Sequence, residues 1–342
     1  MMANILVTGG LGYIGSHTVV ELIQHNHTVI IIDNLSNSEL KVLSGIQEIT
    51  GVLPQFEQID ICDKKAVLQC FSSHAPIDAV IHFAAYKAVG ESVQKPLEYY
   101  ANNVYGLLVL LEAMRETNTS NLVFSSSCTV YGQPLELPVT EQAPLQKATS
   151  PYGNTKQMCE DIIQDYIASG VSFKASLLRY FNPIGAHPSA CIGELPKGVP
   201  NNLVPFITQT AAGIRNELQV FGNDYNTPDG SAIRDYIYVV DLAKAHVAAM
   251  NRLLNTDSAH MCDICNLGTG TGVSVLEMIT AFEQATGVRV PYRISPRRAG
   301  DIEQVWASTD YANTLLHWKA QTPLADVMRS AWKWEKKIRG IK

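Results

Sequence analysis

The sequence contains no long hydrophobic run, no excess of basic residues, no low-complexity tract and no internal repeat. None of its apolar stretches approaches the roughly 18 residues that span a bilayer, and no basic and apolar leader opens the chain. We therefore expect neither a membrane helix nor a signal peptide. The 26 basic and 32 acidic residues give a net charge of −6, which argues against a general binder of nucleic acid or anionic membranes.

The seven cysteines do not form a disulfide or metal pattern. Their number is odd and they are scattered along a large chain, which is typical of free thiols in a reducing compartment, so we expect a cytoplasmic protein. Cys262 and Cys265 form a C-x-x-C, but no second pair follows at a spacing that suits zinc. We expect these two thiols in a buried strand, and no metal site.

The 342 residues are 46% hydrophobic and 17% charged, a globular composition with enough length for two domains. In the first half, short β-rich runs alternate with longer helical patterns. The expected strands are 4–7, 28–32, 55–58, 79–82, 121–125 and 174–179, and helices are expected to begin near residues 15, 64, 104 and 152. This alternation predicts a Rossmann-type, doubly wound parallel sheet of the α/β class.

After Phe181 the alternation ends. Turn-forming residues are dense in 182–200 and 222–230, which is typical of segments that shape a binding site. We expect a first domain of residues 1–180 and a smaller, irregular α/β domain of residues 181–342. Residues 234–256 resume a strand-helix pattern and are a candidate to rejoin the first sheet.

Gly9, Gly12 and Gly15 follow the first expected strand in the spacing G-x-x-G-x-x-G and open a helix. Such a turn brings a helix N-terminus close to a pyrophosphate, although a tight turn without a ligand gives the same pattern. Asp33 ends the second strand, where a carboxylate accepts from ribose hydroxyls and repels a 2′-phosphate, so it selects NAD over NADP. The alternative for Asp33 is a cap or turn acid. Asp60 and Ile61, after the third strand, fit adenine recognition.

Tyr152 and Lys156 are four residues apart, so on a helix their side chains share one face. A nearby positive charge, from the lysine or from oxidised nicotinamide, favours the phenolate that a general base requires. Ser127 closes a strand at the edge where α/β sheets bind ligands, and its hydroxyl can share the proton of a substrate hydroxyl. A Tyr–Lys surface pair is the alternative, but serine, tyrosine and lysine in this order after a glycine turn favour catalysis.

Several longer motifs run in register from the N-terminus to about Trp306, among them TGGLGYIGSHT, FSSSCTVYG, SPYGNTK, LRYFNPIGAHPS and RDYIYVVDLAKAH. With them the chain resembles the UDP-glucose/UDP-galactose 4-epimerase family, the extended branch of the short-chain dehydrogenase/reductases. The resemblance implies that Tyr152 is the catalytic base, assisted by Ser127 and Lys156. It implies an NAD site made of Gly9, Gly12, Tyr13, Ile14, Gly15, Asp33, Asn34, Asn37, Asp60, Ile61, Phe83, Ala84, Lys87, Asn102, Ser125, Tyr152, Lys156 and Tyr180. It implies a sugar-nucleotide site made of Lys87, Ser127, Tyr152, Phe181, Asn182, Asn202, Leu203, Phe221, Arg234, Arg298, Asp301 and Val305.

The reaction that the resemblance implies is inversion at C4 of a UDP-hexose through a transient 4-keto sugar, with NAD regenerated in each turnover. Cys128 and Thr129 stand where sugar-nucleotide 4,6-dehydratases have an acidic pair, which argues against that alternative. A non-catalytic NAD-binding sensor is the other alternative, although such proteins commonly lose the tyrosine or the lysine. Ala85 and Tyr86 replace the usual Gly-Leu beside the cofactor.

The resemblance also implies a substrate range and an assembly. Val305 holds the position that borders the sugar C2 substituent, where a tyrosine restricts relatives to glucose and galactose. Valine therefore predicts use of UDP-N-acetylglucosamine and UDP-N-acetylgalactosamine as well, although plain apolar packing remains an alternative for this residue. Dimers of the family pair helices equivalent to 104–116 and 152–169, so we expect a homodimer.

Overall fold

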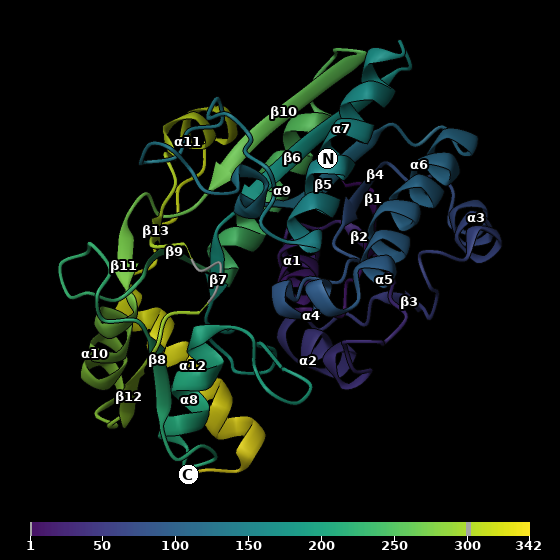
Figure 1. Ribbon diagram of the computed structural model, residues 1–342. Coiled ribbons are helices and arrows are strands. Elements are labelled where there is room, and N and C mark those ends of the chain that lie inside the picture. The colour runs from purple at the N-terminus through teal and green to yellow at the C-terminus, as the bar shows by residue number, and fades with distance from the viewer. Residues whose placement is uncertain (1, 299–301) are drawn as a thin grey trace.

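The computed structural model describes residues 2–298 and 302–342, and a large parallel sheet with helices on both faces dominates it (Figure 1). Its strands are β1 (Asn4–Thr8), β2 (Thr28–Ile32), β3 (Gln55–Glu57), β4 (Ala79–His82), β5 (Asn121–Ser127), β6 (Phe173–Tyr180) and β10 (His260–Leu267). They lie in the order β10-β6-β5-β4-β1-β2-β3, and every pairing is parallel. The strand order reverses between β1 and β4, the place where sheets of this kind bind ligands. The predicted doubly wound sheet is confirmed.

The strands are apolar throughout because both faces of the sheet are covered. In β1, Ile5 and Val7 belong to one core cluster and Leu6 to the other, as alternating side chains require. The covering elements are α1 (Tyr13–Gln24), α2 (Lys41–Thr50), α3 (Lys64–Ser73), α4 (Val89–Gln94), α5 (Pro96–Tyr100), the π-helix Ala101–Tyr105, α6 (Gly106–Glu116), the 3₁₀ turn Cys128–Tyr131, α7 (Pro151–Ala168) and α9 (Val239–Leu254). Helix α2 was not among the helices expected from the sequence.

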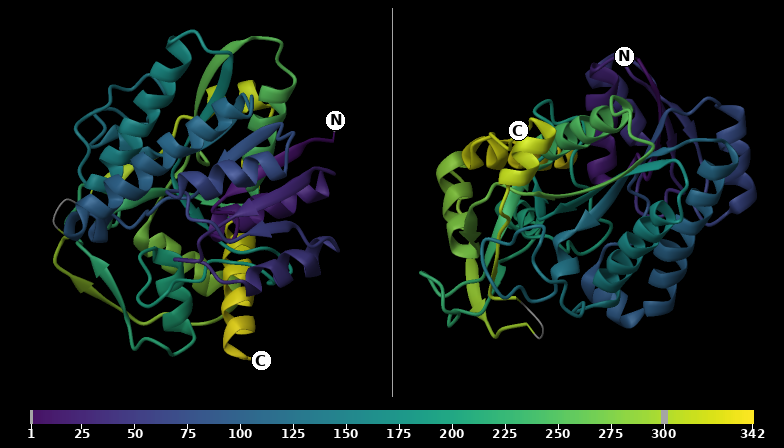
Figure 2. Two further views of the ribbon diagram at one scale, coloured as in Figure 1. Left: turned by 90° about the vertical axis from the view of Figure 1, so that its right-hand side faces the viewer. Right: turned by 90° about the horizontal axis from the view of Figure 1, so that it is seen from above.

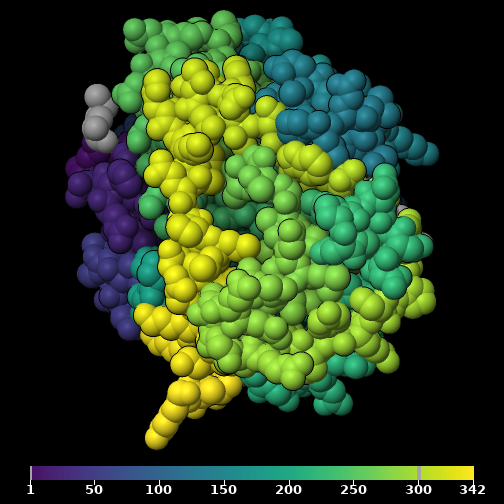
Figure 3. All heavy atoms as spheres, turned by 90° about the vertical axis from the view of Figure 1, so that its left-hand side faces the viewer, coloured from purple at the N-terminus to yellow at the C-terminus, as the bar shows by residue number. Residues whose placement is uncertain are grey.

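A smaller unit holds the remaining strands and helices. They are β7 (Asn182–Ile184), α8 (Leu203–Ala211), β8 (Leu218–Phe221), β9 (Ile233–Tyr238), β11 (Gly272–Ser274), α10 (Val275–Thr286), β12 (Tyr292–Ser295), β13 (Gln304–Val305), α11 (Asp310–Leu316) and α12 (Leu324–Arg339). In the right-hand view of Figure 2 the purple and blue N-terminal residues lie on one side and the yellow-green residues on the other. Figure 3 shows the C-terminal segment, in yellow, running along the green residues of this unit. Trp332 packs there against Phe282, with ring centroids 5.8 Å apart.

The chain passes between the two units more than once. Strand β9 pairs with β7, β11 and β13 in the smaller unit, whereas α9 packs on α1 and β10 pairs with β6 over eight residues. Residues 234–256 therefore contribute a strand to one unit and a helix to the other. Cys262 and Cys265 lie in β10, and all seven cysteines are thiols. In the described part of the chain, none of the helices combines the length and the apolar character that crossing a membrane requires.

Candidate active site

Two adjoining cavities lie where the large sheet meets the smaller unit. The first, of about 360 Å³, opens at the carboxyl ends of β1, β2, β4, β5 and β6. The second, of about 440 Å³, lies in the smaller unit and shares Asn182 and Asn202 with the first. Apart from Asp60, every residue predicted to bind the cofactor lines the first cavity. The fold thus gathers residues that are far apart in the sequence at the ligand-binding edge of the sheet.

The glycine turn fits tightly against the strand ends. Gly9 has a φ of +66°, and a Cβ on it would lie 2.8 Å from the backbone nitrogen of Ala84. A Cβ on Gly15 would lie 2.3 Å from the carbonyl oxygen of Gly9. Gly12 is the N-cap of α1 and offers no side-chain cap, so the first amide groups of the helix stay available to a ligand. An anion beside them would gain hydrogen bonds and the field of the helix dipole.

Asp33 organises the loop after β2. Its carboxylate accepts hydrogen bonds from the backbone nitrogen of Leu11 at 3.1 Å, from that of Leu35 at 2.9 Å and from the Ser38 hydroxyl at 2.7 Å. The acid therefore lies at the cavity wall and is itself held in place. Asp60 does not line the cavity; it accepts from the side-chain amide of Asn34 at 3.0 Å.

The serine, tyrosine and lysine predicted from the sequence meet in the first cavity. Helix α7 begins at Pro151, and the Ser150 hydroxyl caps it by accepting from the Gly153 backbone nitrogen at 3.1 Å. This cap fixes the first turn, which carries Tyr152. One turn later Lys156 donates from Nζ to the Ser125 carbonyl oxygen at 2.6 Å.

Burial shifts the pKa values of Tyr152 and Lys156 in opposite directions and moves them apart. Burial raises the pKa of Tyr152 to about 12, and a hydrogen bond with Ser127 opposes that rise. Burial lowers the pKa of Lys156 to about 8, opposed by Cys159 and Glu160. Burial is the largest cause of the rise at Tyr152, and the hydrogen bond with Ser127 is the cause that opposes it. In both cases burial disfavours the charged form.

Six of the twelve predicted sugar-nucleotide residues line the second cavity. Leu203, Phe221, Arg234 and Arg298 line it, and the guanidinium of Arg298 lies 4.9 Å from the centre of the Phe221 ring. Two arginines in one cavity suit a diphosphate, which their forked donors bind in pairs. The predicted residue Asp301 lies outside the described residues.

Sequence analysis missed Glu194, which contacts one residue predicted to bind the sugar nucleotide, Asn202, and one predicted to bind both ligands, Lys87. Its Oε1 accepts from the Asn202 side chain at 2.5 Å and lies 3.8 Å from Nζ of Lys87. Burial raises the pKa of this carboxyl above its ordinary value. The only signal in the sequence was its place in the turn-rich stretch 182–200, which had been assigned to a binding site as a whole.

Val305 lies behind the cavity wall. It is 5% exposed and packs in a cluster with Tyr131 and Phe181. Among the described residues it belongs to the lining of neither cavity, although Phe181 lines the first and Arg234, its partner in the β13–β9 pairing, lines the second. The position is thus one layer removed from both cavities.

Residues 5–268 match the family described as "NAD dependent epimerase/dehydratase family". The UDP-glucose 4-epimerase of Yersinia enterocolitica is 51% identical over 333 residues, which cover 97% of each chain.

Two solved structures share the fold over nearly the whole chain. A UDP-glucose-4-epimerase from Stenotrophomonas maltophila with bound NAD and formylated UDP-arabinopyranose has a TM-score of 0.96 at 50% identity, covering 99% of this chain and all of that one. A UDP-glucose 4-epimerase from Bifidobacterium longum in complex with NAD+ and UDP has a TM-score of 0.94 at 46% identity, with the same coverage. The chain therefore belongs to the NAD dependent epimerase/dehydratase family, beside its UDP-glucose 4-epimerases.

Proposed function

We propose that Tyr152 is the catalytic base of a UDP-sugar 4-epimerase, with Ser127 as its hydrogen-bonding partner and Lys156 as a cofactor-binding cation. The chain is an NAD-dependent isomerase that interconverts UDP-glucose and UDP-galactose, as its relatives at about half identity do. The observation that carries the assignment of roles is the meeting of these three side chains in a cavity that adjoins a second cavity, which Arg234 and Arg298 line.

The first cavity fits a dinucleotide. The uncapped N-terminus of α1 suits the pyrophosphate, and the Asp33 carboxylate at the end of β2 suits ribose hydroxyls. Lys156 donates to the Ser125 carbonyl oxygen and lines the same cavity as Tyr152, which supports a role in binding the cofactor. When bound there, NAD would supply the acceptor and donor of a hydride for C4 of the sugar, and its positive ring would favour the tyrosine phenolate.

The protein's own groups then divide the work. Tyr152 takes the proton of the C4 hydroxyl and later returns one, while the Ser127 hydroxyl holds the substrate oxygen and the phenol in line. Arg234 and Arg298 anchor the diphosphate in the second cavity. An anchored diphosphate with a loosely held sugar allows the 4-keto sugar to turn and present its other face.

The substitution Tyr152→Phe tests this assignment. It removes the proton-transfer group and keeps the ring, so the variant should retain NAD while turnover falls by at least about a hundredfold. Bound nucleotide and the rate of UDP-galactose conversion are measured on the same preparation. Near-normal turnover in a folded Tyr152→Phe protein contradicts the mechanism.

We also propose that UDP-N-acetylglucosamine and UDP-N-acetylgalactosamine are substrates. The support is that valine, not tyrosine, occupies position 305 behind Phe181, a wall of the first cavity. An acetamido group adds several heavy atoms over a hydroxyl, and a close-packed site accommodates them only where a side chain is small. Val305→Tyr should abolish epimerisation of the N-acetylated sugar and spare UDP-glucose, with Val305→Ala as the control that keeps both. The idea fails if the wild type never converts the N-acetylated sugar, or if the tyrosine variant loses both substrates equally.

The proposed assembly is a homodimer in the cytoplasm, serving galactose metabolism. Apolar side chains are exposed on neighbouring helices, with Leu97 of α5 79% exposed, Leu108 of α6 41% and Met158 of α7 38%. Exposed apolar side chains on these helices are compatible with an interface between subunits. The proposed division assigns residues 1–180 to NAD and 181–342 to the sugar nucleotide, with α9 and β10 of the second range joining the large sheet. Sedimentation of the wild type against Leu108→Lys tests the dimer, since a charge at a two-fold contact should yield monomers.

A further inference from the structure

Helix α7 carries a third polar residue in line with its two catalytic candidates. Tyr152, Lys156 and Glu160 follow one another at intervals of four, so they form one stripe along the helix. All three are buried, and the Glu160 side chain is fully so. Tyr152 and Lys156 reach the first cavity, whereas Glu160 faces the sheet below it.

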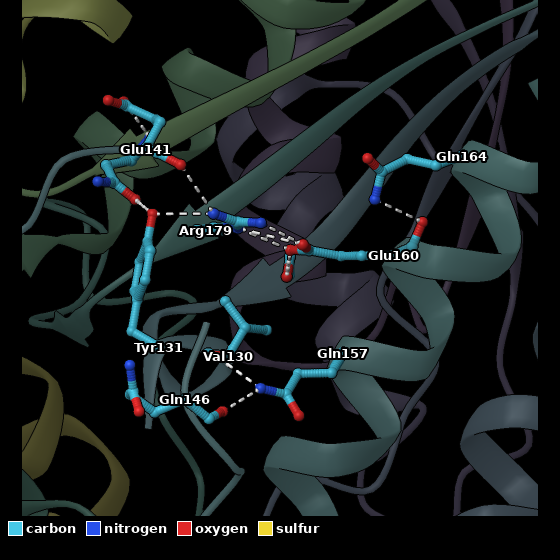
Figure 4. A network of polar contacts seen from close by, with 10 residues as sticks. Val130, Tyr131, Glu141, Gln146, Gln157, Glu160, Gln164 and Arg179 are labelled. Carbon is cyan, nitrogen blue, oxygen red and sulfur yellow. Dashed lines mark hydrogen bonds and ion pairs between the residues drawn. The ribbon is translucent and has the colours of Figure 1, made fainter. Parts of the chain in front are cut away.

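Glu160 forms a buried ion pair with Arg179 of β6. Nε of the arginine lies 3.0 Å and 3.2 Å from the two carboxylate oxygens, and Nη2 lies 2.5 Å from Oε2. The Ser126 hydroxyl of β5 donates to the same carboxylate. Figure 4 shows the guanidinium between Glu160 on α7 and the Tyr131 hydroxyl. The pair therefore joins the catalytic helix to two strands, through a fork whose geometry tolerates little rotation.

The same network continues to the wall that carries Val305. Nη1 of Arg179 donates to the Tyr131 hydroxyl at 3.0 Å, and that hydroxyl donates to the Asn266 side chain at 2.7 Å. The Asn266 side chain in turn donates to the Val139 carbonyl at 2.9 Å. Val139 pairs with the segment directly after β13, accepting from the Ser308 nitrogen at 2.7 Å.

A second tie joins α7 to the same region. The side-chain amide of Gln157 donates to the carbonyl oxygens of Val130 and Gln146, each at 2.7 Å (Figure 4). Helix α7 is thus held on its inner face by directed polar contacts from the sheet and from the loop over it. Apolar packing alone gives a helix more freedom to slide or rotate than hydrogen bonds of fixed geometry do.

We propose that the Glu160–Arg179 pair is a positioning element. It sets where Tyr152 and Lys156 lie relative to Ser127 and to the wall that carries Val305. The proposal rests on the catalytic roles proposed above. The contribution of a buried ion pair to stability is matched or exceeded by well-packed apolar residues of similar size. Apolar side chains make no directed hydrogen bonds that fix the orientation of the helix. Replacing the pair with apolar residues should therefore change kcat more than stability.

The deciding variant replaces both charges, as Glu160→Leu with Arg179→Met, because loss of one partner alone leaves a buried charge unpaired. It is compared with Asp263→Leu with Arg252→Met. That control pair joins α9 to β10 with Nε and Oδ2 2.7 Å apart, and in the described part of the chain neither residue has a hydrogen bond or ion pair to α7. Measured quantities are kcat and KM for UDP-galactose, NAD bound per chain and the melting temperature.

The Glu160/Arg179 double variant should lose about tenfold to a hundredfold in kcat, the usual result of misplacing reacting groups by up to about 1 Å. Its KM and its NAD content should stay within about twofold of wild type, and the control should keep its kcat. A folded double variant with the kcat of the wild type overturns the proposal. A rise in KM or a fall in NAD content as large as the fall in kcat also overturns the proposal, because that pattern indicates general structural damage.

Tyr131→Phe decides the case if the double variant does not fold. It keeps the ring, which lies 4.9 Å from the Arg179 guanidinium, and removes only the hydroxyl that links the pair to Asn266. A fall of about threefold to tenfold in kcat at unchanged KM supports the proposal, and an unchanged kcat overturns it. Tyr152→Phe, assayed alongside, separates failure of the proposed function from failure of the positioning role. Wild-type turnover in that variant removes the proposed function itself, whereas an inactive Tyr152→Phe beside a fully active double variant removes only the positioning role.

Discussion

Replacement of Ser127 by alanine should move the pH dependence of turnover to higher pH. Burial raises the pKa of Tyr152 to about 12, and the hydrogen bond with Ser127 is the interaction that lowers it. A hydrogen bond to a charged group contributes about 1.5–3 kcal/mol, which corresponds to roughly one to two pKa units. The serine stabilises the phenolate, so its loss raises the tyrosine pKa further.

The sign of the effect on the rate follows from the role of the base. Tyr152 must be deprotonated to accept the C4 hydroxyl proton, so kcat rises with pH through the pKa of the enzyme–substrate complex. A higher pKa shifts this rising limb upward by the same one to two units. Below the limb, kcat of Ser127→Ala should then fall by about tenfold to a hundredfold.

The assay is kcat for UDP-galactose at saturation between about pH 6 and pH 10, on protein with bound NAD, whose positive ring lowers the Tyr152 pKa below about 12 and so brings the rising limb toward this range. Ser176→Ala is the matched control, because Ser176 is a buried serine of β6 whose hydroxyl has no hydrogen-bond partner among the described residues. It should leave the profile unchanged. A Ser127→Ala profile that is lower but parallel, with the midpoint of the wild type, refutes the role of Ser127 in setting the pKa.

Three further predictions concern the cofactor and stability. Asp33→Asn should narrow the preference for NAD over NADP by about tenfold, because the carboxylate repels a 2′-phosphate; a wild-type protein that copurifies with NADP contradicts this. Burial lowers the pKa of His82 to about 3 and that of His246 to about 4, so the stability tied to their neutral forms is present above pH 6.5 and lost as the pH falls. Each histidine should lower the free energy of unfolding by roughly 2 kcal/mol at pH 5, measured by urea unfolding. The His246→Gln variant should lose less stability in acid than the wild type. Lys197 donates to two carbonyl oxygens of the loop after β2, each at 3.0 Å, so Lys197→Gln should release NAD several-fold faster in gel filtration, whereas the exposed Lys319→Gln should not.

The strands of the large sheet could be predicted closely because both faces are buried. A parallel strand between two helical layers is a continuous apolar run, so its ends are visible in the sequence. Strands β2 and β4 have the bounds that were expected, and β5 extends two residues further, through Ser127. The short strands of the smaller unit leave no such signal. Strand β13 has two residues, and its existence depends on pairing with β9, about 70 residues earlier in the chain.

The candidate site shows the same limit. Spacing predicted that Tyr152 and Lys156 share a helix face, because that relation is local. The acid Glu194 stands between Lys87 and Asn202 through contacts between distant segments, and no local pattern specifies such contacts. Asp60 was placed correctly after β3, but its carboxylate contacts Asn34 instead of lining the cavity. The direction of a loop side chain depends on tertiary partners that sequence periodicity does not contain.

Side chains alternate along β5 and β6, so the ends of these two strands present catalytic residues on one face and residues that hold α7 on the other. Ser125, Ser127 and Tyr180 line the cavity, whereas Ser126 and Arg179 lie on the opposite face, against α7. The pairing of Ser126 with Arg179 and of Ser127 with Tyr180 keeps the two sets in separate rows. A one-residue slip of β5 would turn Ser127 toward the helix, and a one-residue slip of β6 would turn Arg179 toward the cavity. Three consecutive serines are therefore not equivalent, and the register of β5 against β6 decides which of them can contact a substrate.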